Sequence, residues 1–193
     1  MIDGPVYVAT TTAHKAAEIA AILAPTGLEI LPVPHMPDVV EDGVTFRDNA
    51  ILKARAAAAL HGAPCLADDS GLAVDVLEGA PGVHSARFAG EDATDKDNNA
   101  RLIRELEARG VQDPAAAFVC CVVLAAPDGT LLAEAEARVE GVIRWPALGD
   151  GGFGYDPLFF HPPSDCRLSE LTPEAKNAVS HRGQALRKLA ASL

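Results

Sequence analysis

Cysteine is scarce in this sequence, and the few that occur are not spaced as in a disulfide-stapled or zinc-binding fold. The chain has four cysteines and no Cys-x-x-Cys pair. Two of them, Cys120 and Cys121, lie inside an apolar run, where thiols pack as small core residues. The pattern therefore indicates neither a disulfide framework nor a zinc site.

Long apolar runs and an excess of positive charge are also missing. No segment approaches the ~20 apolar residues of a membrane span, and residues 1–5 lack a basic leader followed by an apolar run. The net charge of -11 argues against a nucleic-acid polymer or an anionic membrane as partner, because such binding needs many Lys and Arg contacts with phosphate. We therefore expect a cytoplasmic protein that binds neither.

Lysine is rare as well, and its placement is informative. Of the five lysines, Lys15, Lys53 and Lys176 lie inside polar motifs. This distribution favours a small, highly charged anion as the ligand.

The apolar pattern predicts an α/β fold. A chain of 193 residues with 49% hydrophobic content can bury the core of one domain or of two closely joined lobes. We expect a strand over 6–10 and helices over 13–23 and 46–60, the second helix begun by a capping box of Thr45 and Asp48. A third helix is expected over 92–109, followed by a hairpin with strands at 118–126 and 133–140. Two C-terminal helices are expected to begin at residues 172 and 180. This order predicts a mixed sheet, with a cleft between two lobes to gather the polar motifs.

The most informative motif is Asp68-Asp69-Ser70-Gly71, which follows a short apolar run. We expect the two carboxylates to close a buried strand before a Ser-Gly turn, where they could hold a hard divalent cation such as Mg²⁺. In the alternative interpretation, Asp68 and Ser70 only cap backbone N–H groups of a polar turn. The motif alone leaves both open.

Two further segments are suited to phosphate. Residues 10–15 place three threonines and Lys15 between a strand and a helix N-terminus, where backbone N–H groups and the helix dipole favour an anion. The segment lacks the glycines of a Walker loop, and a plain N-cap is the simpler alternative. In the second helix, Asn49 and Lys53 lie four apart on one face, at a cleft edge or in solvent.

The glycine-rich segment 149–157 contains Phe153 and Tyr155, which a flexible surface loop would leave in solvent. An aromatic ring between glycines can instead stack on a nucleobase, a contact worth ~1–3 kcal/mol. Three cations follow, Lys176, His181 and Arg182, and we expect them to lack acidic neighbours and to bind carbonyl oxygens or phosphate.

Taken in this order, these segments closely resemble the inosine/xanthosine triphosphate pyrophosphatase family, and the similarity covers nearly the whole chain. One departure is Thr12, which stands where the family usually has Asn in the first loop. A hydroxyl donates one hydrogen bond to a phosphate, whereas an amide has two donor hydrogens. Asp48 likewise stands where Glu is common, a change that a capping box tolerates.

The resemblance implies a single domain over residues 1–193 with two lobes, a long mixed sheet flanked by helices and a central substrate cleft. It also implies a homodimer, Mg²⁺ as cofactor, and hydrolysis of ITP, dITP and XTP to a monophosphate and pyrophosphate.

The resemblance also assigns roles to residues. Asp69 is the general base, with Ser70 beside the substrate, and Glu41 and Asp69 bind the metal. Triphosphate binding is assigned to Lys53 and to the first loop, which comprises Thr10, Thr11, Thr12, Ala13, His14 and Lys15. Base recognition falls to Phe153, Gly154, Tyr155, Asp156, Lys176, His181 and Arg182.

Two alternatives stay open. One is a pyrophosphatase for modified pyrimidine nucleotides on a related fold. The other is a nucleotide-sensing module that binds without turnover, which would need a damaged acidic site, although Glu41, Asp68 and Asp69 are all present.

Overall fold

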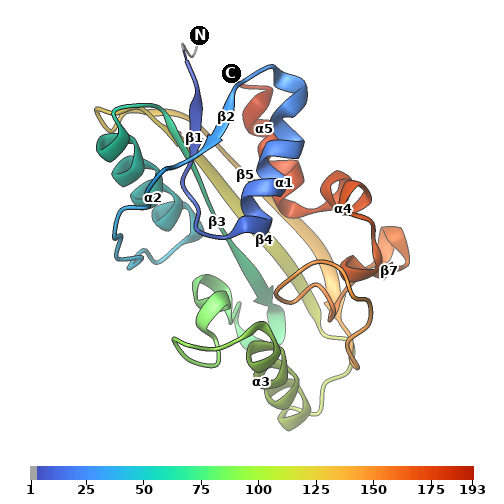
Figure 1. The fold of residues 1–193 in the computed structure, drawn as a ribbon. Coiled ribbons are helices and arrows are strands. Elements are labelled where there is room, and N and C mark those ends of the chain that lie inside the picture. The colour runs from blue at the N-terminus through green and yellow to red at the C-terminus, as the bar shows by residue number, and fades with distance from the viewer. Residues whose placement is uncertain (1–3) are drawn as a thin grey trace. The chain divides into compact units, whose positions relative to one another are not determined.

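The computed structural model describes residues 4–193, apart from the side chain of His14 (Figure 1). The strands in this range form a seven-stranded sheet with the order β2-β1-β3-β4-β5-β6-β7. β1 (Val6–Val8) pairs in parallel with β2 (Ile30–Pro32) and with β3 (Cys65–Val74). The antiparallel part contains β5 (Leu131–Ile143), β6 (Phe159–His161) and β7 (Cys166–Arg167). The predicted α/β fold with a mixed sheet is confirmed.

The chain divides into two compact units, and β3, β4 (Ala115–Ala125) and β5 contribute residues to both. The first unit comprises the described part of Met1–Ser70 together with Cys120–Ala137 and His181–Leu193. The second comprises Gly71–Val119 and Arg138–Ser180. No helix in the described residues is long and apolar enough to cross a bilayer.

Helices cover both faces of the sheet in the first unit. α1 (Ala13–Leu23) and α5 (His181–Ala190) lie side by side (Figure 1) and pack against one face, where Ile19 and Leu186 join Leu66 in one core cluster. α2 (Phe46–His61) covers the other face. Its buried apolar residues on that face are alanines, which let the helix backbone approach the strands: Ala50, Ala54, Ala57 and Ala58.

The helix boundaries follow the capping residues. α2 begins with the expected capping box, in which the Thr45 and Asp48 side chains each accept a hydrogen bond from the other's backbone N–H, and ends at Gly62 in the left-handed region at φ 62°. The third helix was expected from residue 92, but α3 (Asp95–Ala108) starts three residues later because Thr94 is its N-cap.

The second unit has a core of its own, in which Leu102 and Leu106 of α3 pack with Phe118, Tyr155 and Phe159. The short helix α4 (Pro173–Val179) begins after the Thr172 cap. The predicted hairpin is present, and its strands are longer than expected because β4 and β5 continue into this unit.

Candidate active site

The two adjacent carboxylates lie in the middle of a strand. The expectation that they close the strand before a turn is wrong, because β3 continues through Ser70 and Gly71 to Val74. Successive side chains of a strand point to opposite faces of the sheet. Leu66 belongs to the cluster under α1 and α5, and Ala67 to the cluster under α2. Asp68 therefore faces α1 and α5, and Asp69 faces α2.

On the α2 face, Asp69 belongs to a compact acid–lysine cluster. Its Oδ1 lies 2.9 Å from Lys53 Nζ, which also lies 3.1 Å from Glu41 Oε2. Asn49 Nδ2 donates to Asp69 Oδ2 at 3.3 Å. Lys53 is only 8% exposed, so the interpretation that it is a solvent residue is wrong.

Asn49 also positions the segment that carries Glu41. Its Oδ1 accepts a hydrogen bond from the Gly43 N–H at 2.8 Å, and a Cβ at residue 43 would lie 2.5 Å from that oxygen. The sequence predicts only that Asn49 and Lys53 lie on one face of α2. It does not predict that the Asn49 side chain hydrogen-bonds to Gly43 and Asp69.

Burial and charge act in opposite directions on this cluster. Burial raises the pKa of Asp69 above its ordinary value, and the Lys53 ammonium opposes that shift. Burial disfavours the ammonium of Lys53, but Asp69, Asp68 and Glu41 together raise its pKa. Lys53 therefore stays cationic beside a carboxylate whose proton affinity is increased, which suits a proton acceptor.

The donor set of this cluster fits Mg²⁺. The carboxylate oxygens Glu41 Oε2 and Asp69 Oδ1 lie close together, because they are 3.1 and 2.9 Å from the same atom, Lys53 Nζ. In the part of the chain that the structure describes, no three His, Cys, Asp or Glu side chains form a group that could hold a metal ion. Mg²⁺ needs no such cage, because one or two carboxylates with water and substrate phosphates complete its six ligands.

On the opposite face, Asp68 is the centre of a buried ion-pair network. Its Oδ2 accepts from Arg182 Nε at 3.2 Å and Nη2 at 3.1 Å, and lies 3.3 Å from Lys15 Nζ. Burial alone would raise the pKa of Asp68, but Lys15, Arg182 and Lys53 hold it well below its usual range. Asp68 is thus a permanent anion that orients two cations.

Arg182 is 1% exposed and its guanidinium is held from several sides. Besides Asp68, it contacts Ser70 Oγ at 3.0 Å through Nη2 and Glu18 through Nη1. Glu18 was not among the predicted site residues, although it follows Lys15 by three positions on α1. The expectation that these cations lack acidic neighbours is wrong for Arg182.

The first loop leads into α1 as predicted. Thr11, Thr12 and Ala13 are exposed, and Thr10 Oγ1 accepts from the Thr12 N–H at 3.1 Å. Thr12 is the N-cap of α1 but forms no side-chain capping hydrogen bond. The predicted contact of His14 lies outside the described side chains.

The predicted base-recognition residues fall into two groups. In the second unit, the Lys176 Nζ lies 2.7 Å from Asp156 Oδ2 and 4.2 Å from the centroid of the Phe153 ring. Asp156 also accepts from the Phe153 N–H at 2.9 Å, so Lys176 too has an acidic neighbour. His181 and Arg182 belong to the first unit.

Tyr155 differs from Phe153 in its environment. It is 4% exposed, lies in the core of the second unit and donates its hydroxyl hydrogen to the Ser85 carbonyl oxygen at 2.9 Å. Gly154 between them adopts φ 60°, a conformation that favours glycine. Of the two rings, that of Phe153, which is half-buried, is therefore the more exposed.

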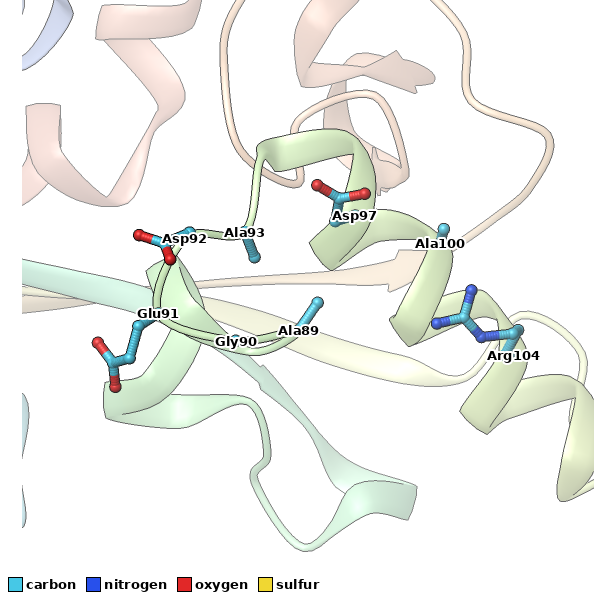
Figure 2. A pocket seen from close by; sticks show the side chains of 8 residues that line it. All are labelled: Ala89, Gly90, Glu91, Asp92, Ala93, Asp97, Ala100 and Arg104. Atoms are coloured by element: carbon cyan, nitrogen blue, oxygen red, sulfur yellow. The ribbon is translucent and has the colours of Figure 1, made fainter.

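A separate pocket of about 490 Å³ lies in the second unit (Figure 2). Its charged lining residues are Glu91 and Asp92 on a loop and Asp97 and Arg104 on α3. None of the predicted site residues lines it. The predicted active-site residues therefore lie outside this pocket.

The fold and the site together define a class: an open mixed α/β sheet in which carboxylates on one central strand hold lysines from the flanking helices. The model of the Ham1 family matches residues 6–192. A dITP/XTP pyrophosphatase of Geobacter sulfurreducens is 50% identical over 182 residues, which cover 93% of this chain and 91% of that protein. The corresponding protein of Geobacillus kaustophilus is 48% identical over 187 residues, 95% of this chain and 91% of its own.

The structural comparison agrees. A HAM1 protein from Coxiella burnetii superposes with a TM-score of 0.89 at 40% identity, and 97% of each chain is covered. The chain belongs to the Ham1 family.

Proposed function

We propose that this protein hydrolyses the non-standard purine nucleoside triphosphates dITP, XTP and ITP to the monophosphate and pyrophosphate. The observation that carries the proposal is the cluster of Asp69, Lys53 and Glu41, in which one buried ammonium lies within hydrogen-bond distance of two carboxylates. We assign to it a proton acceptor, a cation for phosphate and a second carboxylate. The predicted enzyme class, a hydrolase of nucleoside triphosphate anhydride bonds, agrees with the names of the relatives.

The chemistry can be assigned to the side chains of this cluster. A water molecule attacks the α-phosphorus, Asp69 accepts its proton, and the bond from the α-phosphorus to the oxygen bridging to the β-phosphorus breaks as pyrophosphate leaves. Lys53 stabilises the negative charge that develops on the phosphates. Glu41 and Asp69 would hold Mg²⁺, which when bound supplies further positive charge for the triphosphate.

The remaining residues are proposed to bind the substrate. Lys15 and the N-terminus of α1 are suited to the triphosphate, because the ammonium and the helix dipole both favour an anion. The substrate contacts proposed for this end are Thr10, Thr11, Thr12, Ala13, His14, Lys15 and Ser70. Those proposed for the base are Phe153, Gly154, Tyr155, Asp156, Lys176, His181 and Arg182.

The polarity of these groups favours a 6-oxo purine. Hypoxanthine and xanthine present an oxygen at C6, whereas adenine presents an amino donor. Donors from Lys176, His181 or Arg182 would be left facing another donor if ATP were bound, and sites of this kind reject the wrong analogue strongly. Homodimer formation and a cytoplasmic location stay predictions from the sequence.

A panel of nucleotides tests the proposal. The purified protein would be incubated with ITP, dITP, XTP, GTP, ATP and dTTP in Mg²⁺ and, in parallel, with excess EDTA, and the products would be identified. We expect monophosphate and pyrophosphate from the first three and none with EDTA. Preferred turnover of a pyrimidine nucleotide would favour the first alternative, and tight binding without products would favour a sensing module.

Lys53→Ala should lower kcat/KM for every triphosphate by a similar factor. Lys53 lies with the carboxylates and is proposed to contact phosphate, so the identity of the base should not matter. Steady-state kinetics on dITP, XTP and ATP would measure the three ratios. A loss confined to dITP and XTP would instead place Lys53 in base recognition.

A further inference from the structure

The backbone of Gly154 is held on both sides by the first turns of α3. The Gly154 N–H donates to Asp95 Oδ2 at 2.7 Å, and the Gly154 carbonyl oxygen accepts from Asn99 Nδ2 at 3.0 Å. All three residues belong to the second unit. Asp95 and Asn99 lie four apart, so both side chains come from one face of the helix.

The start of α3 is itself fixed. Thr94 and Asp97 form a capping box, with Asp97 Oδ2 accepting from the Thr94 N–H at 2.9 Å. Asn98, which is 3% exposed, accepts from the Ala89 N–H at 2.7 Å and donates to the Ala86 carbonyl oxygen at 3.0 Å. The side chain of buried Asn98 thus ties this helix end to residues 86 and 89 without using the capping box, so the hydrogen bonds to Gly154 do not depend on the cap.

The position of Gly154 determines how its aromatic neighbours are presented. On the C-terminal side, Tyr155 is anchored by its hydroxyl to Ser85 and by its ring in the core. On the N-terminal side, the Lys176 Nζ lies over the ring of Phe153, 4.2 Å from its centroid. A shift of the Gly154 backbone would move the Phe153 ring relative to Lys176, because only one peptide separates the two residues.

We infer that Asp95 and Asn99 are positioning residues for base recognition. Acting through Gly154, they orient the Phe153 ring and the loop backbone toward a purine base. This inference rests on the proposed function, because it takes Phe153 and Gly154 as contacts of the base. Neither Asp95 nor Asn99 has to touch the nucleotide.

The two hydrogen bonds to Gly154 have opposite chemical requirements. The Gly154 N–H needs an acceptor, and both a carboxylate and an amide oxygen can accept. The Gly154 carbonyl needs a donor, and a carboxylate has none. Asp95→Asn should therefore keep its hydrogen bond, whereas Asn99→Asp should lose its own and place an anion beside the carbonyl oxygen.

Steady-state kinetics with dITP and XTP would test this asymmetry. We expect Asn99→Asp and Asp95→Ala to raise KM roughly ten- to a hundredfold with kcat changed far less, because the cluster around Asp69 is untouched. Asp95→Asn should stay close to wild type. The matched control is Asp97→Ala, near the start of α3 (Figure 2), which removes the hydrogen bonds between Asp97 and Thr94 but no contact with Gly154.

The control separates positioning from general weakening of the helix. Asp97→Ala should lower the midpoint of thermal unfolding and leave KM unchanged. A similar rise in KM for Asp97→Ala, or a wild-type KM for Asn99→Asp, would overturn the inference. The proposed function fails separately, if the wild-type protein itself turns over neither dITP nor XTP.

Discussion

Asp69→Asn is expected to reduce kcat for dITP and XTP by roughly 10²–10⁴-fold, the usual cost of removing a general base. The substitution keeps the volume of the side chain and removes its charge. Lys53 retains Glu41 at 3.1 Å, so the variant should fold. Turnover at saturating Mg²⁺, with circular dichroism as a check of folding, would measure the effect.

A matched control is available on an exposed carboxylate of the same unit. Glu134 on β5 pairs with Arg47 in solvent, so Glu134→Gln removes a charge without touching the cluster. We expect this variant to keep wild-type turnover. If Asp69→Asn retained more than a third of the wild-type kcat, Asp69 would not be the general base.

Arg182→Ala is expected to destabilise the protein by about 3–5 kcal/mol, because Asp68 and Glu18 lose a buried partner. For a chain of this size, that corresponds to a fall of roughly 6–20 °C in the unfolding midpoint. The same substitution tests base recognition. If the guanidinium also contacts the purine, kcat/KM for ITP should fall roughly ten- to a hundredfold while the low activity on ATP changes little.

Two variants make this result interpretable. Arg182→Lys keeps a charge near Asp68 but not the forked donors, so it should recover part of the stability without restoring the ITP/ATP ratio. Lys188→Ala removes an exposed cation from the same helix, with one exposed hydrogen bond to the Glu136 carbonyl oxygen, and should change both quantities far less than Arg182→Ala. Parallel losses on ITP and ATP would show that Arg182 acts by holding Asp68 and not by contacting the base.

Much of the fold was predictable because local signals agreed with the tertiary packing. The alternation of strands and helices, the capping box at Thr45 and the alanine surface of α2 all specified the same arrangement. The short strands β2, β6 and β7 were not predicted. They have two or three residues each, too few to show the alternation of apolar and polar residues that marks a strand, and they depend on pairing with other segments of the chain.

For the candidate site, the sequence identified the residue types but not their partners. The motif Asp68-Asp69 was found, whereas its division between two faces of the sheet was missed because a terminal turn was expected. Likewise, the acidic partners of the late cations were missed, since Glu18 and Asp68 lie more than a hundred residues from Arg182 along the chain. Such pairs arise only when α1, β3 and α5 come together.

Asp68 and Asp69 lie on opposite faces of the sheet, so the site depends on whether the length of β3 before them changes by an odd or an even number of residues. Inserting one residue just before Asp68 would carry each carboxylate to the side opposite its present cations, because side-chain direction alternates with every residue. Inserting two residues would preserve the sides and change only the distance along the strand. The segment before these acids should therefore tolerate even changes in length better than odd ones.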